Sequence, residues 1–245
     1  MHNLNLITKA FTESHYDGIV IGGQTASGKS ALAVELAQEI NGEVIGADSR
    51  QIYQGMVIGT GAIQEKEMNR IPHHLIGIIP PKKSLNASIY KELAYQKINE
   101  IIQRKHVPII VGGTGLYLDS IIFNFSFKGV EEKPEMSPWK LLLVVINGDK
   151  NILNEKIDQR HRAMFTKTPS IIDETKELLK NGFTKELEAM TSIGYRESMQ
   201  YIDGQISIEE AIKKTQQEAR SYAKRQRTWL RRLLKKYPGI IIEAE

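Results

Sequence analysis

The feature that most constrains this chain is the glycine-rich stretch at residues 23–30, which reads GQTASGKS. It fits the pattern G-x-x-x-x-G-K-[ST], in which backbone amides curl around a polyphosphate at the N-terminus of a helix. An apolar run at residues 19–21 precedes it and an amphipathic segment at residues 30–40 follows it, as a strand and a helix would. In such a loop Lys29 supplies a positive charge, and the Ser30 hydroxyl is placed to ligate a Mg²⁺ that rides on the phosphates. The stretch therefore predicts a polyphosphate site without identifying the reaction.

Apolar runs and helical patterns alternate along the rest of the chain. We expect further strands at residues 43–47, 107–111, 141–146 and 240–242. We expect helices at residues 84–105, 116–125, 151–165 and 171–180, and a long C-terminal helix that begins after the cap at Ser207. Residues 51–81 are rich in glycine and proline and predict a loop, and residues 1–17 look like a poorly determined lead-in. The alternation predicts an α/β fold, a P-loop NTPase-like parallel sheet with flanking helices, as a single domain at residues 18–245.

Asp48 follows directly after the strand expected at residues 43–47. The carboxyl ends of parallel strands form the ligand crevice of an open sheet, so Asp48 should face the same crevice as Lys29. A carboxylate there can ligate Mg²⁺ or accept a proton from a nucleophile, although a turn or helix cap would also account for it. The strand at residues 107–111 ends in glycines and lacks the acidic residue that usually provides the second Mg²⁺ ligand of nucleotide hydrolases. This favours an enzyme that treats a polyphosphate as a leaving group over an ATPase.

Positive charge is concentrated near the C-terminus. The net charge is +4, but residues 213–236 hold ten Lys and Arg against one acidic residue, which leaves the remainder at −5. Arg220, Lys224, Arg227 and Arg231 recur there at helical spacing, away from the apolar positions of the same segment. Because few acidic residues are interleaved, this stripe favours binding of a polyanion over a simple solvated face.

Other charged residues carry weaker signals. Arg160 and Arg162 are expected on a helix that returns over the crevice, where arginines can clamp phosphate oxygens, although a solvated helix face is the alternative. His73 and His74 have no further ligand at a suitable spacing, which favours a structural or RNA-contacting role over a metal site. The chain contains no cysteine, which excludes thiol catalysis and a zinc–thiolate cluster.

Nothing in the chain indicates a membrane or an export signal. No apolar run approaches the roughly 18 residues of a membrane span, and residues 1–17 lack a basic start followed by an apolar core. We therefore expect a cytoplasmic protein without a membrane partner, and we expect it to act as a monomer.

Six motifs in this order resemble those of the bacterial tRNA dimethylallyltransferases, also called tRNA isopentenyltransferases. They are GQTASGKS at residues 23–30, DSRQIY at 48–53, PHHL at 72–75, GGTGLY at 112–117, IGYRE at 193–197 and AKRQRTWLR at 223–231. The resemblance implies transfer of a dimethylallyl group from dimethylallyl diphosphate to the exocyclic amine of an adenosine. That adenosine would lie 3′ to the anticodon in the anticodon loop of tRNA.

The resemblance also implies a role for each matching residue. Asp48 would take the amine proton, and Thr25 would act with Lys29 to stabilise the leaving group. The diphosphate would be bound by Gly23, Gln24, Thr25, Ala26, Ser27, Gly28, Lys29, Ser30 and Arg160. The tRNA would be contacted by Asp48, Ser49, Arg50, Gln51 and Thr114, and by the basic stripe of Arg220, Lys224, Arg227 and Arg231. Mg²⁺, held through Ser30, is the implied cofactor.

The chain departs from the family pattern at two places, and alternatives stay open. The family carries a helical insert with an Asn-Asp-Pro-x-Arg motif after the GGT segment, and only residues 128–138 occupy that place here. Residues 60–62 lack the lysine that is usual there. The alternatives are an adenylate isopentenyltransferase that acts on free AMP or ATP, a small-molecule kinase, and an inactive RNA-binding relative that keeps the fold.

Overall fold

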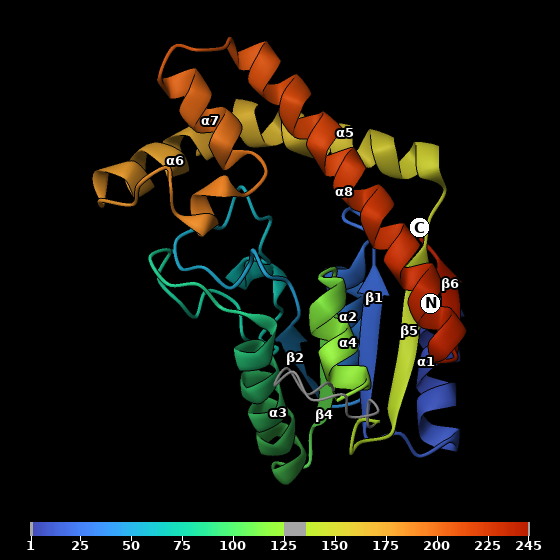
Figure 1. Ribbon diagram of the computed structural model, residues 1–245. Coiled ribbons are helices and arrows are strands. Elements are labelled where there is room, and N and C mark those ends of the chain that lie inside the picture. The colour runs from blue at the N-terminus through green and yellow to red at the C-terminus, as the bar shows by residue number, and fades with distance from the viewer. Residues whose placement is uncertain (1, 125–135, 245) are drawn as a thin grey trace.

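A single parallel sheet forms the centre of the molecule (Figure 1). The computed structural model describes residues 2–124 and 136–244. Six strands pair in the order β3-β2-β4-β1-β5-β6, and every pairing is parallel. In chain order the strands are β1 Gly18–Gly23, β2 Gly42–Gly46, β3 His73–His74, β4 Val107–Gly112, β5 Leu141–Asn147 and β6 Gly239–Glu243. The predicted α/β class and parallel sheet are confirmed.

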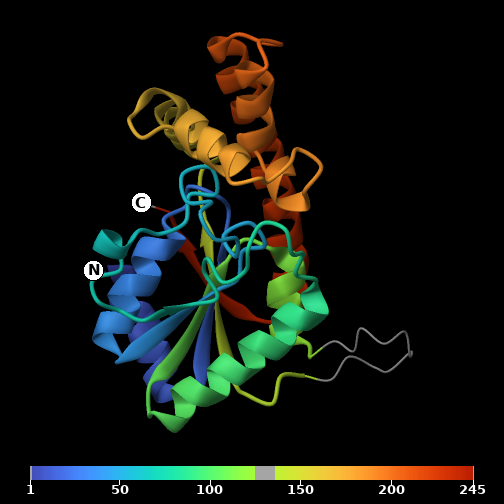
Figure 2. The same ribbon diagram turned by 90° about the vertical axis from the view of Figure 1, so that its left-hand side faces the viewer.

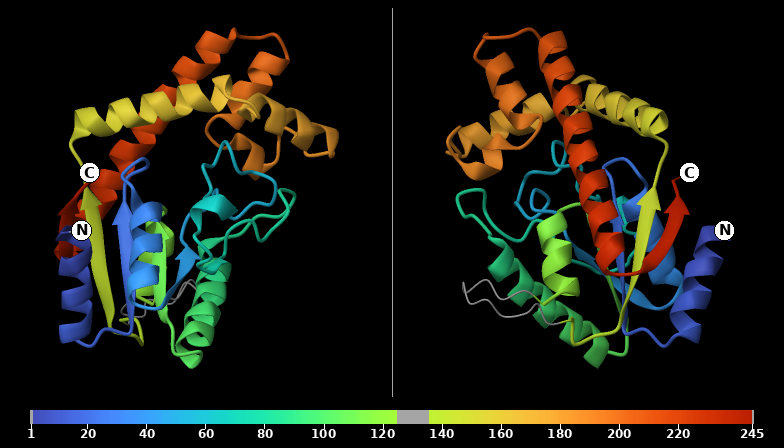
Figure 3. Two further views of the ribbon diagram at one scale, coloured as in Figure 1. Left: turned by 180° about the vertical axis from the view of Figure 1, so that it is seen from behind. Right: turned by 45° about the vertical axis from the view of Figure 1, so that its right-hand side comes forward.

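Helices cover both faces of the sheet (Figure 3). Helices α1 His2–Glu13 and α2 Lys29–Glu39 pack on one face, against strand residues such as Ile19. The opposite face is covered by α3 Ala87–Gln103, α4 Gly115–Ile122 and the C-terminal half of α8 Ile208–Lys236, against residues such as Val20. The central strands are buried on both sides, which is why they appear in the sequence as continuous apolar runs.

A helical cap stands beyond the carboxyl ends of the strands (Figure 2). It consists of α5 Lys150–Thr166, α6 Ile171–Lys180, the short helix η2 Glu188–Thr191, α7 Tyr195–Ile202 and the N-terminal half of α8. The loop between β2 and β3, which includes the short helix η1 Glu65–Glu67, contributes Ile52 and Met56 to the same apolar core. The cap therefore fixes this loop over the crevice that the strand ends form.

The structure differs from the sequence prediction at the N-terminus and in the predicted loop at residues 51–81, which contains η1 and the edge strand β3 paired with β2. Residues 2–13, expected to be poorly determined, form α1, because Leu4, Ile7 and Phe11 follow a helical spacing and pack onto the sheet. Ile7 is fully buried. The other predicted helices and strands are present, with ends shifted by a few residues. Residues 128–135, at the place of the family insert, and Phe125, at the end of a predicted helix, lie outside the described residues.

The paired histidines lie at the edge of the sheet, in β3. His74 Nε2 lies 2.6 Å from a carboxylate oxygen of Glu43, which also accepts a hydrogen bond of 2.8 Å from Arg104. His73 Nδ1 lies 2.8 Å from the carbonyl oxygen of Ile71. These contacts are structural, and the described residues contain no group of three or more His, Cys, Asp or Glu that could hold a metal ion. Within the same residues no helix has the length and apolarity to cross a membrane.

Candidate active site

The phosphate loop at residues 23–30 joins β1 to α2 in a conformation suited to an anion. Ala26 and Gly28 adopt positive φ angles of 62° and 87°, and Gly28 caps the N-terminus of α2. Such alternating backbone conformations turn successive amides toward a common point at the positive end of the helix. The Ser27 hydroxyl is buried and has no hydrogen-bond partner among the described residues. The loop thus offers amide and hydroxyl donors that a phosphate could satisfy.

Lys29 is the cationic side chain of the phosphate loop. Its Nζ donates to the carbonyl oxygen of Gln24 at 2.6 Å. Burial lowers the pKa of Lys29 to about 8, while Asp48 opposes this shift and Arg160 adds to it. The charges of Asp48 and Arg160 are therefore both close enough to act on Lys29.

Helix α8 is docked directly onto the phosphate loop. The Gln226 side chain accepts a hydrogen bond from the Thr25 amide at 2.8 Å and donates one to the carbonyl oxygen of Gly113 at 3.0 Å. The Gln24 side chain donates to the carbonyl oxygen of Ala223 at 3.0 Å. A Cβ atom on Gly113 would overlap the Gln226 side-chain amide, so this contact between α8 and the end of β4 depends on a glycine at residue 113. These contacts link the phosphate loop, the end of β4 and α8 into one unit.

The turn after β2 is tied to the end of β4. The Asp48 carboxylate accepts a hydrogen bond from the Arg50 amide at 2.9 Å, so Asp48 shapes the turn as well as facing the crevice. The Ser49 amide donates to the Thr114 hydroxyl at 2.9 Å, and Gln51 Nε2 lies 3.4 Å from the carbonyl oxygen of Gly61. The structure therefore brings together four of the residues predicted to surround the substrate base. The Arg50 side chain instead extends to the cap.

Arg160 and Arg162 diverge on α5. Arg160 donates to the carbonyl oxygen of Gly61 at 3.2 Å. Burial lowers the pKa of Arg160, and the charges of Asp48 and Glu67 oppose this shift. Arg162 forms an ion pair of 2.9 Å with Glu209 at the start of α8 and takes no part in the crevice. Of the two arginines, Arg160 is the one whose side chain reaches the loop over the crevice.

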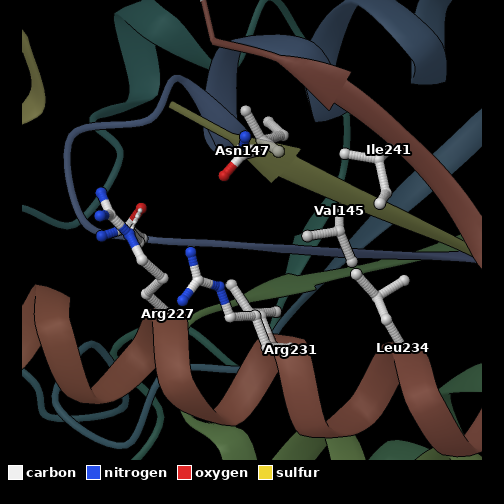
Figure 4. A pocket seen from close by; sticks show the side chains of 9 residues that line it. Val145, Asn147, Arg227, Arg231, Leu234 and Ile241 are labelled. Carbon is white, nitrogen blue, oxygen red and sulfur yellow. Dashed lines mark hydrogen bonds between the residues drawn. The ribbon is translucent and has the colours of Figure 1, made fainter. Parts of the chain in front are cut away.

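The basic residues of α8 occupy different environments. Arg220 forms an ion pair with Asp158 of α5, so its charge is already compensated within the protein. Arg227 lies 3.3 Å from the Gln24 side chain and 3.4 Å from the carbonyl oxygen of Gly148, whereas Lys224 and Arg231 are exposed. Arg227 and Arg231 line a pocket of about 210 Å³ together with residues that include Val145, Asn147, Leu234 and Ile241. Figure 4 shows these side chains. The expectation of one uniform basic stripe needs correction, because partners on other elements neutralise or engage some of its members.

Tyr222 adds to the crevice a polar side chain that the sequence does not reveal. Its hydroxyl lies 3.4 Å from the carbonyl oxygen of Gly113. Burial, reinforced by the nearby charge of Asp48, raises the pKa of Tyr222 to about 12. In sequence this residue counts only as an apolar position of a helix, so its polar end gives no local signal.

Comparison with known proteins agrees with this geometry. A family model described as IPP transferase matches residues 51–136 and 126–233, and the two matches meet where the resemblance places the family insert. The tRNA dimethylallyltransferase of Thermoanaerobacter sp. (strain X514) is 36% identical over an alignment of 279 residues, which covers 87% of this chain and 88% of the relative. The enzyme of the same name from Thermoanaerobacter pseudethanolicus gives the same values. Since this alignment is longer than the chain, it contains gaps in the chain.

Solved structures share the fold. The tRNA isopentenylpyrophosphate transferase of Bacillus halodurans has a TM-score of 0.83 at 31% identity, covering 93% of this chain and 90% of that one. The corresponding transferase of Staphylococcus epidermidis has a TM-score of 0.82 at 31% identity, covering 92% of each chain. A eukaryotic dimethylallyltransferase that acts on tRNA has a TM-score of 0.83 at 23% identity, covering 93% of this chain and 73% of that one, and so shares the fold.

Proposed function

This chain belongs to the IPP transferase family, whose curated members matched here are tRNA dimethylallyltransferases, and we propose that it prenylates tRNA. In the proposed reaction a dimethylallyl group passes from dimethylallyl diphosphate to the exocyclic amine of the adenosine 3′ to the anticodon. The observation that carries the proposal is the crevice at the strand ends, where hydrogen bonds of Gln226 and Thr114 join the phosphate loop, the end of β4 and the turn after Asp48. The end of β4 adds glycines and Thr114 to this crevice, with no second acidic residue.

The leaving group determines what the phosphate loop must do. The amine nitrogen forms a bond to the allylic carbon, the carbon–oxygen bond breaks, and its electron pair leaves with the diphosphate. Fixed donors stabilise that growing charge without having to reorganise. The loop amides, the unpaired Ser27 hydroxyl, Lys29 and Arg160 are the donors on hand. The Thr25 amide is engaged with Gln226, so Thr25 would contribute its hydroxyl.

The amine must lose a proton as it becomes alkylated. Asp48 would accept it, because its carboxylate lies at the strand end that faces Lys29 and Arg160. The Arg50 amide orients this carboxylate. An amine that has become cationic on alkylation loses its proton readily, so a carboxylate can serve as the base.

Mg²⁺ is the cofactor that we propose for this site. Ser30 is exposed in the first turn of α2, and its hydroxyl is a hard oxygen donor. Mg²⁺ is commonly held by one or two protein oxygens together with substrate phosphates and water, so this small donor set fits. When bound, Mg²⁺ would add positive charge at the diphosphate.

The acceptor side of the crevice suits a nucleic acid. A base must leave its stack to react, and the turn at Ser49, Arg50 and Gln51 together with Thr114 would surround it. Exposed cations such as Lys224 and Arg231 on α8 would meet phosphates and make binding dependent on salt. We propose that the enzyme works on the anticodon loop as a cytoplasmic monomer.

The test is incorporation of label from dimethylallyl diphosphate, with Mg²⁺, into total tRNA and into AMP in parallel. We expect label in tRNA, and its loss in Asp48→Ala. Label in AMP but not in tRNA would show an adenylate isopentenyltransferase instead. ATP turnover stimulated by a small acceptor, without any prenyl transfer, would show a kinase.

A further inference from the structure

A short loop after Met56, at residues 57–61, is anchored by one carboxylate of the cap. Glu174 of α6 accepts hydrogen bonds from the amides of Val57, Ile58 and Gly59 at 3.0, 2.9 and 3.2 Å. It also accepts the hydroxyl hydrogen of Tyr195, which is fully buried. Hydrogen bonds to an ionised carboxylate are short and strong, and four donors on one carboxylate leave the loop little freedom.

The same loop carries the oxygen that Arg160 uses. The chain turns at Gly61 with a φ of 59°, and the Gly61 carbonyl oxygen accepts the hydrogen bond of 3.2 Å from the Arg160 guanidinium. A Cβ atom on Gly61 would overlap that guanidinium. In this chain the guanidinium occupies the space that a side chain at residue 61 would fill.

We propose that Gly61 and Glu174 are positioning residues for the diphosphate site. Glu174 holds residues 57–59 in place, and Gly61 leaves the space in which Arg160 is presented to the crevice beside Lys29 and Asp48. Neither residue needs to touch the substrate. The proposal rests on the proposed function in that it takes dimethylallyl diphosphate as the ligand that Arg160 meets.

Gly61→Ala tests the space requirement, and Gly77→Ala is its matched control. Gly77 has a φ of 60°, and nothing lies within 4 Å of a Cβ atom built on it, so both variants carry the same backbone strain but only one displaces Arg160. We expect Gly61→Ala to raise the KM for dimethylallyl diphosphate about tenfold, as loss of a charge-assisted contact does. The KM for tRNA should change by less than about twofold, and Gly77→Ala should change neither value appreciably.

A double-mutant cycle separates positioning from general loosening of the fold. If Gly61 acts through Arg160, Gly61→Ala should add little to the defect of Arg160→Gln. Additive effects, an unchanged KM in Gly61→Ala, or an equal rise in Gly77→Ala would overturn the proposal for Gly61.

The anchor is tested by Glu174→Gln with Glu177→Gln, an exposed residue of the same helix, as control. We expect a rise in the same KM for Glu174→Gln alone, with the KM for tRNA unchanged. Equal KM values in the two variants would overturn the role of Glu174.

The affinity for inorganic diphosphate, measured by calorimetry, tests the positioning role without requiring turnover. Weaker binding in Gly61→Ala than in Gly77→Ala would support the positioning role even if prenyl transfer were not observed. Equal binding in these two variants would refute the positioning role even if prenyl transfer to tRNA were confirmed.

Discussion

Replacing Gln226 by leucine tests whether α8 holds the phosphate loop. Gln226 is 5% exposed, and the substitution leaves the Thr25 amide and the Gly113 carbonyl oxygen without this partner. A buried polar group left unpaired costs about 1–3 kcal/mol. The Tyr222 hydroxyl still reaches the Gly113 carbonyl oxygen at 3.4 Å. We therefore expect the free energy of unfolding to fall by about 3 kcal/mol, which lowers Tm by roughly 6–12 °C for a domain of this size.

The assay is thermal unfolding of Gln226→Leu beside Gln217→Leu, which makes the same chemical change at an exposed position of α8. The control should stay within about 0.5 kcal/mol of the wild type. Gln226→Leu should also bind inorganic diphosphate more weakly, because the phosphate loop loses its anchor. Indistinguishable Tm values for the two variants would refute the inference that α8 is docked through Gln226.

Three further predictions concern buried charges. Burial alone would raise the pKa of Glu43, but hydrogen bonds from Arg104 and His74 outweigh it and hold this pKa at about 2 against 4.5 for the free group. Glu43→Gln should therefore lower the free energy of unfolding by about 3 kcal/mol at pH 7. The difference in this free energy between the variant and the wild type, measured in urea, should shrink as pH falls from 4.5 toward 2. The pKa of Lys29 is lowered to about 8, so kcat/KM for dimethylallyl diphosphate should fall as pH rises through 8, and a flat profile across that range would contradict this. Burial disfavours the charged form of Lys29, so Lys29→Met should raise the free energy of unfolding in urea by about 1–3 kcal/mol relative to the wild type. The same variant should lose activity.

The fold could be predicted because its signals are local. The phosphate loop has a fixed spacing, and strands such as Val107–Gly112 are continuous apolar runs because both of their faces are buried. Helix α1 also carries a local signal, since Leu4, Ile7 and Phe11 share one face. That face is narrow and lies among polar residues, which explains why the segment did not stand out.

The parts of the site that were missed depend on contacts between distant residues. Gln226 meets Thr25 across 201 positions, and Glu174 meets Val57 across 117. No local pattern separates these side chains from ordinary polar residues of a helix. Arg220 is the opposite case, a local pattern that a distant partner modifies. Its charge and spacing predict a phosphate contact, but Asp158, 62 positions away, already pairs with it.

In the proposed reaction the phosphate loop binds the leaving group while a tRNA base lies opposite it. The decisive measurement is mass mapping of nuclease fragments from tRNA incubated with the enzyme, dimethylallyl diphosphate and Mg²⁺. We expect one added five-carbon isoprenoid unit, carried by the fragment with the adenosine 3′ to the anticodon, and no added mass with Asp48→Ala. Unmodified tRNA, or the same added mass with Asp48→Ala as with the wild type, would contradict the proposed reaction.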